Sequence, residues 1–287
     1  HLKTGGVFYP SISPDGKKIV FQNDFDLWTL DLPNGSPKKI TIPVAFDRKD
    51  GDISIVTSDN VAEGFAPAPN GERVAIDFHG DIRIVPTEQG VGEPDVVASS
   101  AWRENNGVFS PDGKTLAYLA MRRPGYEADR FRIVLRSWPE GKERVLTEGW
   151  DRSPSDLAFS ADGKELYCTA DDLGQHALVS VDAASGKART VVGTGHVVAP
   201  QVTGDRIVFL LDSLKGPAEL YLVRSDGGDR KTLTSINEAR LSGARMGEPE
   251  QFTFKGASGD TVHATIVKPV DFDPAKKYPV AFLIHGG

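Results

Sequence analysis

Short runs of β-branched and aromatic residues recur along the chain at regular intervals, which is the pattern of β-strands rather than of helices. Before each such run lies a turn built on Asp-Gly, Asn-Gly or Gly-Asp. These dipeptides are typical of hairpins because their residues tolerate positive φ angles. The five turns are Ser13–Gly16, Ala68–Gly71, Ser110–Gly113, Ser160–Gly163 and Val202–Asp205.

Each turn is followed by a second strand, then a third and a shorter fourth, so the repeating unit holds four strands. The unit recurs about every 45 residues, the period and composition of a β-propeller blade. A sandwich of regular hairpins is the alternative fold, but it does not explain why a similar turn recurs at one place in each unit. The sequence therefore predicts an all-β propeller of five recognisable blades. It leaves open whether the five close alone or belong to a ring of seven or eight.

The repeat ends near residue 238, and the character of the chain changes. We expect a propeller over residues 1–238, a linker over 239–246 and a separate segment over 247–287. This segment begins with a predicted hairpin, Gln251–Phe254 and Val262–Val267. The apolar run Val280–Ile284 is too short to cross a membrane and has the pattern of a buried strand in a parallel sheet. The sequence offers no partner strands for such a sheet, so we expect the run to be exposed or docked on the propeller. The run leads directly into His285-Gly286-Gly287.

The final segment resembles the start of the catalytic domain in the prolyl oligopeptidase family of serine peptidases. The resemblance lies in Phe252-Thr-Phe-Lys-Gly, Val267-Lys-Pro and Tyr278-Pro-Val, followed by His-Gly-Gly. It extends from about Trp102 to Gly287 and is closest to the dipeptidyl and acylaminoacyl peptidase branch. The first hundred residues are more similar to tricorn-protease propellers. The resemblance implies a β-propeller followed by the first strands of an α/β-hydrolase domain.

The resemblance also implies roles for the His-Gly-Gly turn. In α/β-hydrolases such a turn donates one backbone N–H to the oxyanion, so Gly286 and Gly287 are candidate oxyanion-hole residues. His285 would orient the turn and would not be the catalytic base. The nucleophile motif Gly-x-Ser-x-Gly is absent from the sequence. We therefore expect this chain, truncated before the Ser, Asp and His triad, to be inactive by itself.

Candidate substrate contacts lie in Arg123-Pro-Gly-Tyr-Glu-Ala-Asp-Arg130, which resembles a propeller segment of bacterial members of the family. By that resemblance, the Glu127 and Asp129 carboxylates would hold the free amino end of a peptide, since a shielded carboxylate pairs well with an ammonium group. Tyr126 and Arg130 would contact the same substrate. The alternative is that these acids are solvated hairpin charges neutralised by the nearby arginines.

Composition and net charge limit the classes of partner, metal and cofactor that we expect this chain to bind. A net charge of -7 argues against nucleic acid and against an anionic membrane surface. The single cysteine, Cys168, lies in a predicted strand and is expected to be a small core residue. The six histidines show no metal-binding spacing, and no dinucleotide or phosphate motif occurs, so we expect no metal and no cofactor.

Two functions remain. In the first, the chain is the propeller and first catalytic segment of a peptidase that cleaves short peptides, with the propeller controlling substrate access. In the second, it is a non-catalytic propeller that binds proteins or peptides. The family resemblance slightly favours a periplasmic or secreted location, and the sequence leaves homo-oligomerisation open.

Overall fold

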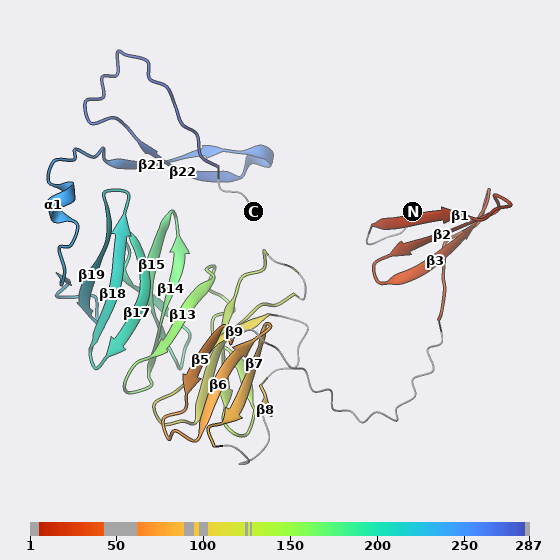
Figure 1. Cartoon of the computed structure of the whole chain (residues 1–287), viewed down its shortest axis with the longest axis horizontal. Coiled ribbons are helices and arrows are strands. Elements are labelled where there is room, and N and C mark those ends of the chain that lie inside the picture. Colours follow the sequence, from red (N-terminus) through yellow and green to blue (C-terminus); the bar gives the residue numbers. More distant parts are fainter. Residues whose placement is uncertain are drawn as a thin grey trace. The chain divides into compact units, whose positions relative to one another are not determined.

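A computed structural model describes residues 6–42, 62–88, 95–97, 103–123, 126 and 128–284. The chain divides into two compact units, residues 1–59 and residues 60–287. The first unit holds one antiparallel sheet of four strands, in chain order, within the residues described (Figure 1). Its strands are β1 (Val7–Ile12), β2 (Lys18–Asn23), β3 (Asp26–Asp31) and β4 (Lys38–Lys39).

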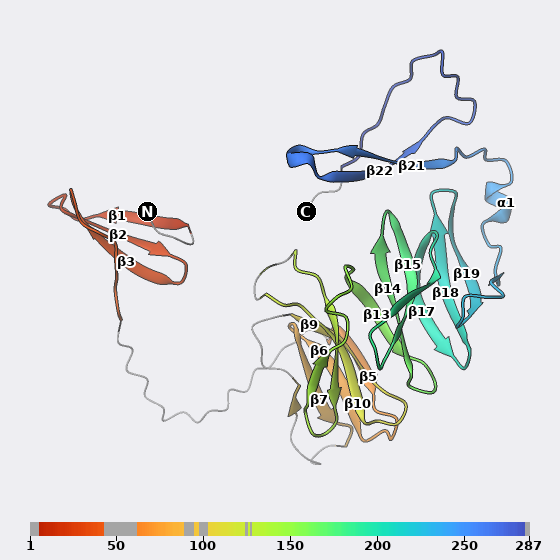
Figure 2. The same ribbon diagram turned by 180° about the vertical axis from the view of Figure 1, so that it is seen from behind.

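The second unit repeats this four-stranded pattern. Two sets of strands form separate sheets, and the other two are joined into one eight-stranded sheet by a parallel pairing of β15 with β17. Figure 2 shows the same strands from behind. The sets are β5 (Gly64–Pro67), β6 (Arg73–Phe78), β7 (Asp81–Pro86), β8 (Asp95–Val96); β9 (Glu104–Phe109), β10 (Thr115–Ala120), β11 (Arg132–Ser137), β12 (Glu143–Val145); β13 (Pro154–Phe159), β14 (Glu165–Asp172), β15 (Gln175–Asp182), β16 (Ala188–Val192); and β17 (His196–Thr203), β18 (Arg206–Ser213), β19 (Gly216–Arg224), β20 (Lys231–Thr232).

These sets are the propeller blades that the sequence predicts. Within the second unit, the first strands of successive blades lie against one another, β5 on β9, β9 on β13 and β13 on β17. The predicted turns join the first and second strands of each blade. In the third blade the Ser110 hydroxyl donates to Asp112, and the backbone N–H of Lys114 donates to the same carboxylate oxygen. Gly113 completes the turn at φ +69°.

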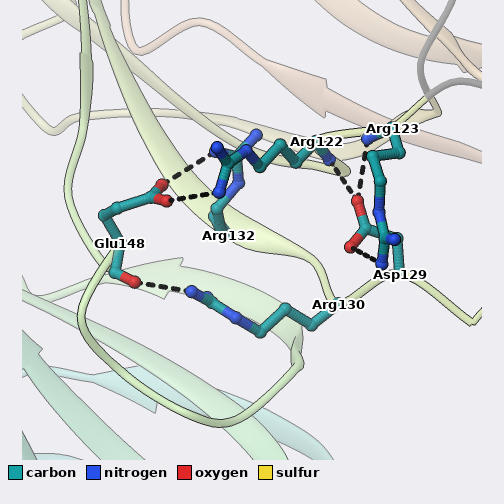
Figure 3. Close-up of a pocket in the computed structure, with 6 residues that line it drawn as sticks. All are labelled: Arg122, Arg123, Asp129, Arg130, Arg132 and Glu148. Carbon is teal, nitrogen blue, oxygen red and sulfur yellow. Dashed lines mark hydrogen bonds and ion pairs between the residues drawn. The ribbon is translucent and has the colours of Figure 1, made fainter.

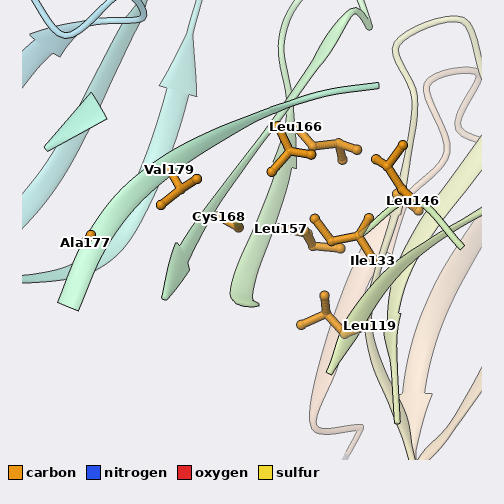
Figure 4. Close-up of a cluster of buried hydrophobic side chains, with 10 residues drawn as sticks. Leu119, Ile133, Leu146, Leu157, Leu166, Cys168, Ala177 and Val179 are labelled. Atoms are coloured by element: carbon orange, nitrogen blue, oxygen red, sulfur yellow. The ribbon is translucent and has the colours of Figure 1, made fainter. Parts of the chain in front are cut away.

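The hydrophobic cores lie between blades, because a single four-stranded sheet cannot bury both of its faces. One core joins the third and fourth blades (Figure 4). Leu119 and Ile133 come from the third blade, while Leu166 and Val179 come from the fourth, and all four are buried. Cys168 lies in the same core and is fully buried, so the expectation that it is a core residue is confirmed. Two further cores lie between the second and third blades and between the fourth and fifth.

The first strand of four blades carries a β-bulge that the sequence analysis did not predict. In each bulge one extra residue interrupts the pairing with the second strand. In each first strand, the residue that directly follows the last paired residue before the bulge adopts positive φ. This conformation is uncommon for residues other than glycine. The four residues are Tyr9, Asn106, Asp156 and Ala199.

The segment after the blades contains a short helix and a hairpin. The helix α1 (Glu238–Leu241) lies at the start of the predicted linker. The predicted hairpin is confirmed as β21 (Pro249–Lys255) and β22 (Thr261–Val267), joined through a 3-10 turn, η1 (Ala257–Gly259). The domain boundary at 239–246 lies within the second unit and stays a prediction.

Of the two arrangements expected for Val280–Ile284, exposed or docked on the propeller, the structure shows the exposed one. The buried strand that the composition of the run predicts does not form. Residues 278–284 form no strand, and the Leu283 side chain is 91% exposed. The physical reason is that a parallel strand exists only through hydrogen bonds to neighbouring strands. The part of the chain described here places no such strand beside this run.

Candidate functional site

Four of the predicted site residues lie outside the residues that the structure describes. They are Glu127 and the turn His285, Gly286 and Gly287. The oxyanion role of the turn and the ammonium-binding role of Glu127 therefore stay predictions. The other three candidates, Tyr126, Asp129 and Arg130, belong to the connection between β10 and β11 in the third blade.

Asp129 is a central contact of this connection. Its carboxylate accepts hydrogen bonds from the backbone N–H groups of Arg122 and Arg123, at 2.7 and 2.8 Å. The Arg123 guanidinium lies 3.3 Å from its second oxygen. Desolvation opposes ionisation, but these hydrogen bonds outweigh it and hold the pKa of Asp129 below its ordinary value. Asp129 is thus an ionised residue whose two oxygens already have partners within the loop.

Arginines dominate the pocket next to this loop. The pocket has a volume of about 400 Å³ and is lined by four arginines and two carboxylates, with Glu148 and Asp129 on opposite sides (Figure 3). It is therefore cationic, which favours a carboxylate or another oxygen-rich group of a ligand over an ammonium group. The lining residues are Arg122, Arg123, Asp129, Arg130, Arg132 and Glu148.

Glu148 organises the far side of the pocket. Its carboxylate accepts a hydrogen bond from Arg132 at 2.8 Å and pairs with Arg122 at 3.7 Å. The hydrogen bond from Arg132 lowers the pKa of Glu148 below its ordinary value. The Arg130 guanidinium donates to the backbone oxygens of Thr147 and Glu148, at 3.3 and 2.5 Å. Arg130 therefore holds the connection between β12 and β13 at Thr147–Glu148. The side chain of Arg122, in contrast, is 72% exposed.

Tyr126 lies at the edge of this group. Its ring is half exposed, and the Arg123 guanidinium lies 3.9 Å from the ring centroid. This cation–π contact occupies one face of the ring. The loop therefore brings together Tyr126, Asp129 and Arg130, as the sequence predicts. Sequence reasoning missed Arg132 and Glu148. The available signal was that Glu148 comes just after the fourth strand of the blade, while Arg132 is the first residue of its third strand.

Cys168 does not add a reactive group to this site. Burial raises the pKa of its thiol to about 12, so the thiolate is not formed near neutral pH. Among the residues described, no group of three or more His, Cys, Asp or Glu side chains is arranged to hold a metal ion. None of the helices in the described part of the chain has the length and apolar character needed to cross a bilayer.

Comparison with solved structures identifies the fold. The chain superposes on the acylaminoacyl peptidase of Pyrococcus horikoshii with a TM-score of 0.56 and 18% identity, covering 92% of this chain and 50% of that one. It superposes on a putative TolB from Agrobacterium tumefaciens with a TM-score of 0.50 and 23% identity, covering 80% of this chain and 81% of that one. At these identities the likeness concerns the fold alone.

Sequence comparison gives a closer relationship. No protein-family model matches the chain. A probable dipeptidyl-peptidase 5 of Aspergillus niger is 36% identical over 189 residues, which are 64% of this chain and 26% of that protein. The chain thus spans about a quarter of that relative. The peptidase-family resemblance predicted from the sequence is therefore confirmed, and the chain is a homologue of dipeptidyl-peptidase 5 proteins over 64% of its length.

Proposed function

We propose that this chain is the propeller and the first catalytic-domain segment of a serine peptidase that cleaves short peptides by the dipeptidyl or acylaminoacyl route. The supporting observation is the 36% identity to a dipeptidyl-peptidase 5 over 189 residues. In the whole enzyme the propeller controls access, admitting short peptides and excluding folded proteins. The cores between successive blades hold these blades against one another, as a fixed entrance requires.

The loop of the third blade is proposed to contact the substrate. Its pocket carries a surplus of guanidinium groups over carboxylates, and the Arg122 side chain is the most open of them. We assign to Arg122 a hydrogen bond to a carbonyl or carboxylate oxygen of the peptide. Asp129 positions the loop, and Glu127 is left as the candidate for the free amino group. Export to the periplasm or the medium is part of the same proposal.

A fluorophosphonate probe tests the catalytic part of the proposal. The probe reacts with an activated serine, so it should label the full-length parent protein and fail to label residues 1–287 alone. An unlabelled parent that still binds peptides would favour a non-catalytic propeller. Labelling of residues 1–287 would contradict the expectation that the nucleophile lies elsewhere.

Substrate contact by the loop is tested separately in the active parent. Arg122→Gln should raise KM for short peptides with little change in kcat, because it removes a contact made equally in the ground and transition states. Arg245→Gln is the matched control, since Arg245 is an exposed arginine that pairs with Asp271 and does not line the pocket. Equal kinetics for the wild type and Arg122→Gln would exclude the assigned contact. If the propeller is a size filter, the parent enzyme should cleave a short peptide. It should leave the same sequence uncut where that sequence lies within a folded protein.

A further inference from the structure

Two histidines and two aspartates form a row across four adjacent strands at the junction of the fourth and fifth blades. Asp171 of β14 is paired with His176 of β15, and His196 of β17 is paired with Asp212 of β18. The parallel pairing of β15 with β17 joins His176 directly to His196. The row therefore crosses from one blade to the next through the two imidazoles.

The two rings are held in matching ways. Nδ1 of His176 lies 2.7 Å from an oxygen of Asp171, and Nδ1 of His196 lies 3.1 Å from an oxygen of Asp212. A carboxylate accepts the proton of Nδ1, so the lone pair of each neutral imidazole is then on Nε2. Neither Nε2 has a hydrogen-bond partner among the residues described. The ring centroids are 5.1 Å apart, with an angle of 63° between the ring planes.

This arrangement has the features of a metal site with two protein ligands. Histidine ligands commonly donate their second ring N–H to a carboxylate, which fixes the tautomer and the ring orientation. Bonds of about 2.1 Å from a tetrahedral ion to two imidazole nitrogens place the ring centres about 5 Å apart. The separation of His176 and His196 agrees with that value. Imidazole pairs suit zinc, copper and nickel better than calcium or magnesium.

We propose that His176 and His196 bind one divalent transition-metal ion, such as Zn²⁺, Ni²⁺ or Cu²⁺, through their Nε2 atoms. With two protein ligands, the remaining coordination positions are filled by water, which the 54% exposure of His196 permits. Asp171 and Asp212 orient the rings and offset the charge of the ion. The bound ion links the fourth blade to the fifth. This site is independent of the proposed peptidase function.

Copper binding to residues 1–287 tests the site. In a His1→Ala background, which removes the terminal imidazole, one equivalent of Cu²⁺ should give an electron paramagnetic resonance spectrum with two coordinated imidazole nitrogens. His196→Gln should weaken Cu²⁺ binding roughly tenfold or more and leave at most one coordinated nitrogen. His263→Gln is the matched control, because His263 is an exposed histidine on β22, and it should change nothing.

Thermal unfolding provides a second measurement that does not depend on copper. Zn²⁺ should raise the Tm of the wild type, because an ion that binds only the folded state stabilises it. The increase should disappear in His196→Gln, whose Tm without metal should match the wild type. A spectrum without paired imidazole nitrogens, or Cu²⁺ affinity unchanged in His196→Gln, would overturn the proposal.

Discussion

The carboxylate of Asp77 accepts a hydrogen bond from the backbone N–H of Asn106, at 2.7 Å. Asp77 belongs to the second strand of one blade, while Asn106 is the bulged residue in the first strand of the next. The neighbouring N–H of Gly107 donates to the other oxygen at 3.2 Å. The buried carboxylate of Asp77 therefore links the second blade to the third at the β-bulge of β9.

The stability contributed by Asp77 should fall as the pH rises. Burial, only partly offset by the two N–H bonds, raises the pKa of Asp77 above its ordinary value of 3.8. The folded state therefore binds this proton more tightly than the unfolded state does. The resulting stabilisation is fully present below the ordinary pKa and is lost as the pH rises through the raised pKa. Unfolding free energies measured against pH should show the wild type losing stability relative to Asp77→Asn across this window.

Asp112 is the control for that experiment because its shift has the opposite sign. The hydrogen bond from Ser110 lowers the pKa of Asp112 below 3.8, so its contribution is present above that value and is lost as pH falls. The wild type should therefore lose stability relative to Asp112→Asn toward low pH. The same direction of change for both variants would contradict the environment assigned to Asp77.

Gly113→Ala should destabilise the protein by about 1–2 kcal/mol, the cost of a left-handed conformation for a residue with a Cβ atom. Gly113 has φ +69°, and an added Cβ would lie in ordinary contact with Pro69, so the backbone conformation alone causes the loss. Gly149→Ala is the control, because nothing lies near an added Cβ there and its φ is not positive. Urea titrations should show a lower midpoint for Gly113→Ala alone.

Cys168 should resist thiol reagents while the protein is folded. The thiol is fully buried and burial raises its pKa to about 12, so both access and thiolate formation are suppressed. Labelling should become fast only in denaturant. Ala244→Cys places a second thiol at an exposed position, and this thiol should react in the folded protein. Rapid labelling of Cys168 without denaturant would show that the core between the third and fourth blades opens readily.

Arg130→Ala should cost more stability than Arg122→Ala. Removing Arg130 deprives two backbone oxygens of a charged donor, and such hydrogen bonds contribute about 1.5–3 kcal/mol each when buried and less when exposed. Arg122 makes an exposed ion pair at 3.7 Å, a type of contact that contributes about 0–1 kcal/mol. Denaturation of both variants at equal ionic strength checks the order, and the reverse order would contradict the structural role given to Arg130.

The apolar run at 280–284 should cause self-association. Val280, Phe282, Leu283 and Ile284 all have exposed side chains, and contiguous exposed apolar surface promotes association. The double substitution Phe282→Lys and Leu283→Lys should shift the protein toward monomer in sedimentation experiments. The paired control is Lys276→Ala with Lys277→Ala, in the preceding loop. An unchanged sedimentation profile for the lysine variant would exclude the run as the contact.

Blade architecture was predictable because its signals are local. The Asp-Gly turns fix where each first hairpin reverses, and runs such as Thr115–Tyr118 and Ala177–Val181 lie within observed strands. Non-local features were not predictable. His176 and His196 are brought together by a strand pairing between blades, which no spacing in the sequence indicates. Val280–Ile284 has the composition of a buried strand, but composition does not supply the neighbouring strands that pairing requires.

The candidate site divides in the same way. The sequence singled out Tyr126, Asp129 and Arg130, and the structure places them in one loop. It did not indicate that one Asp129 oxygen accepts from the backbone N–H groups of Arg122 and Arg123, because backbone donors leave no trace in side-chain identity. Glu148 reaches the pocket from beyond the fourth strand, a placement set by the antiparallel pairing of β11 with β12.

The bulges of the first strands bear on the origin of the blades. One extra residue, in the same conformation and at the same position, occurs in β1, β9, β13 and β17 although the residue types differ. Positive φ at Tyr9 and Ala199 is energetically unfavourable. If each bulge had arisen independently, each blade would have had to accept this conformational cost separately. Duplication of one ancestral unit that already carried the insertion would account for all four bulges without repeating that cost.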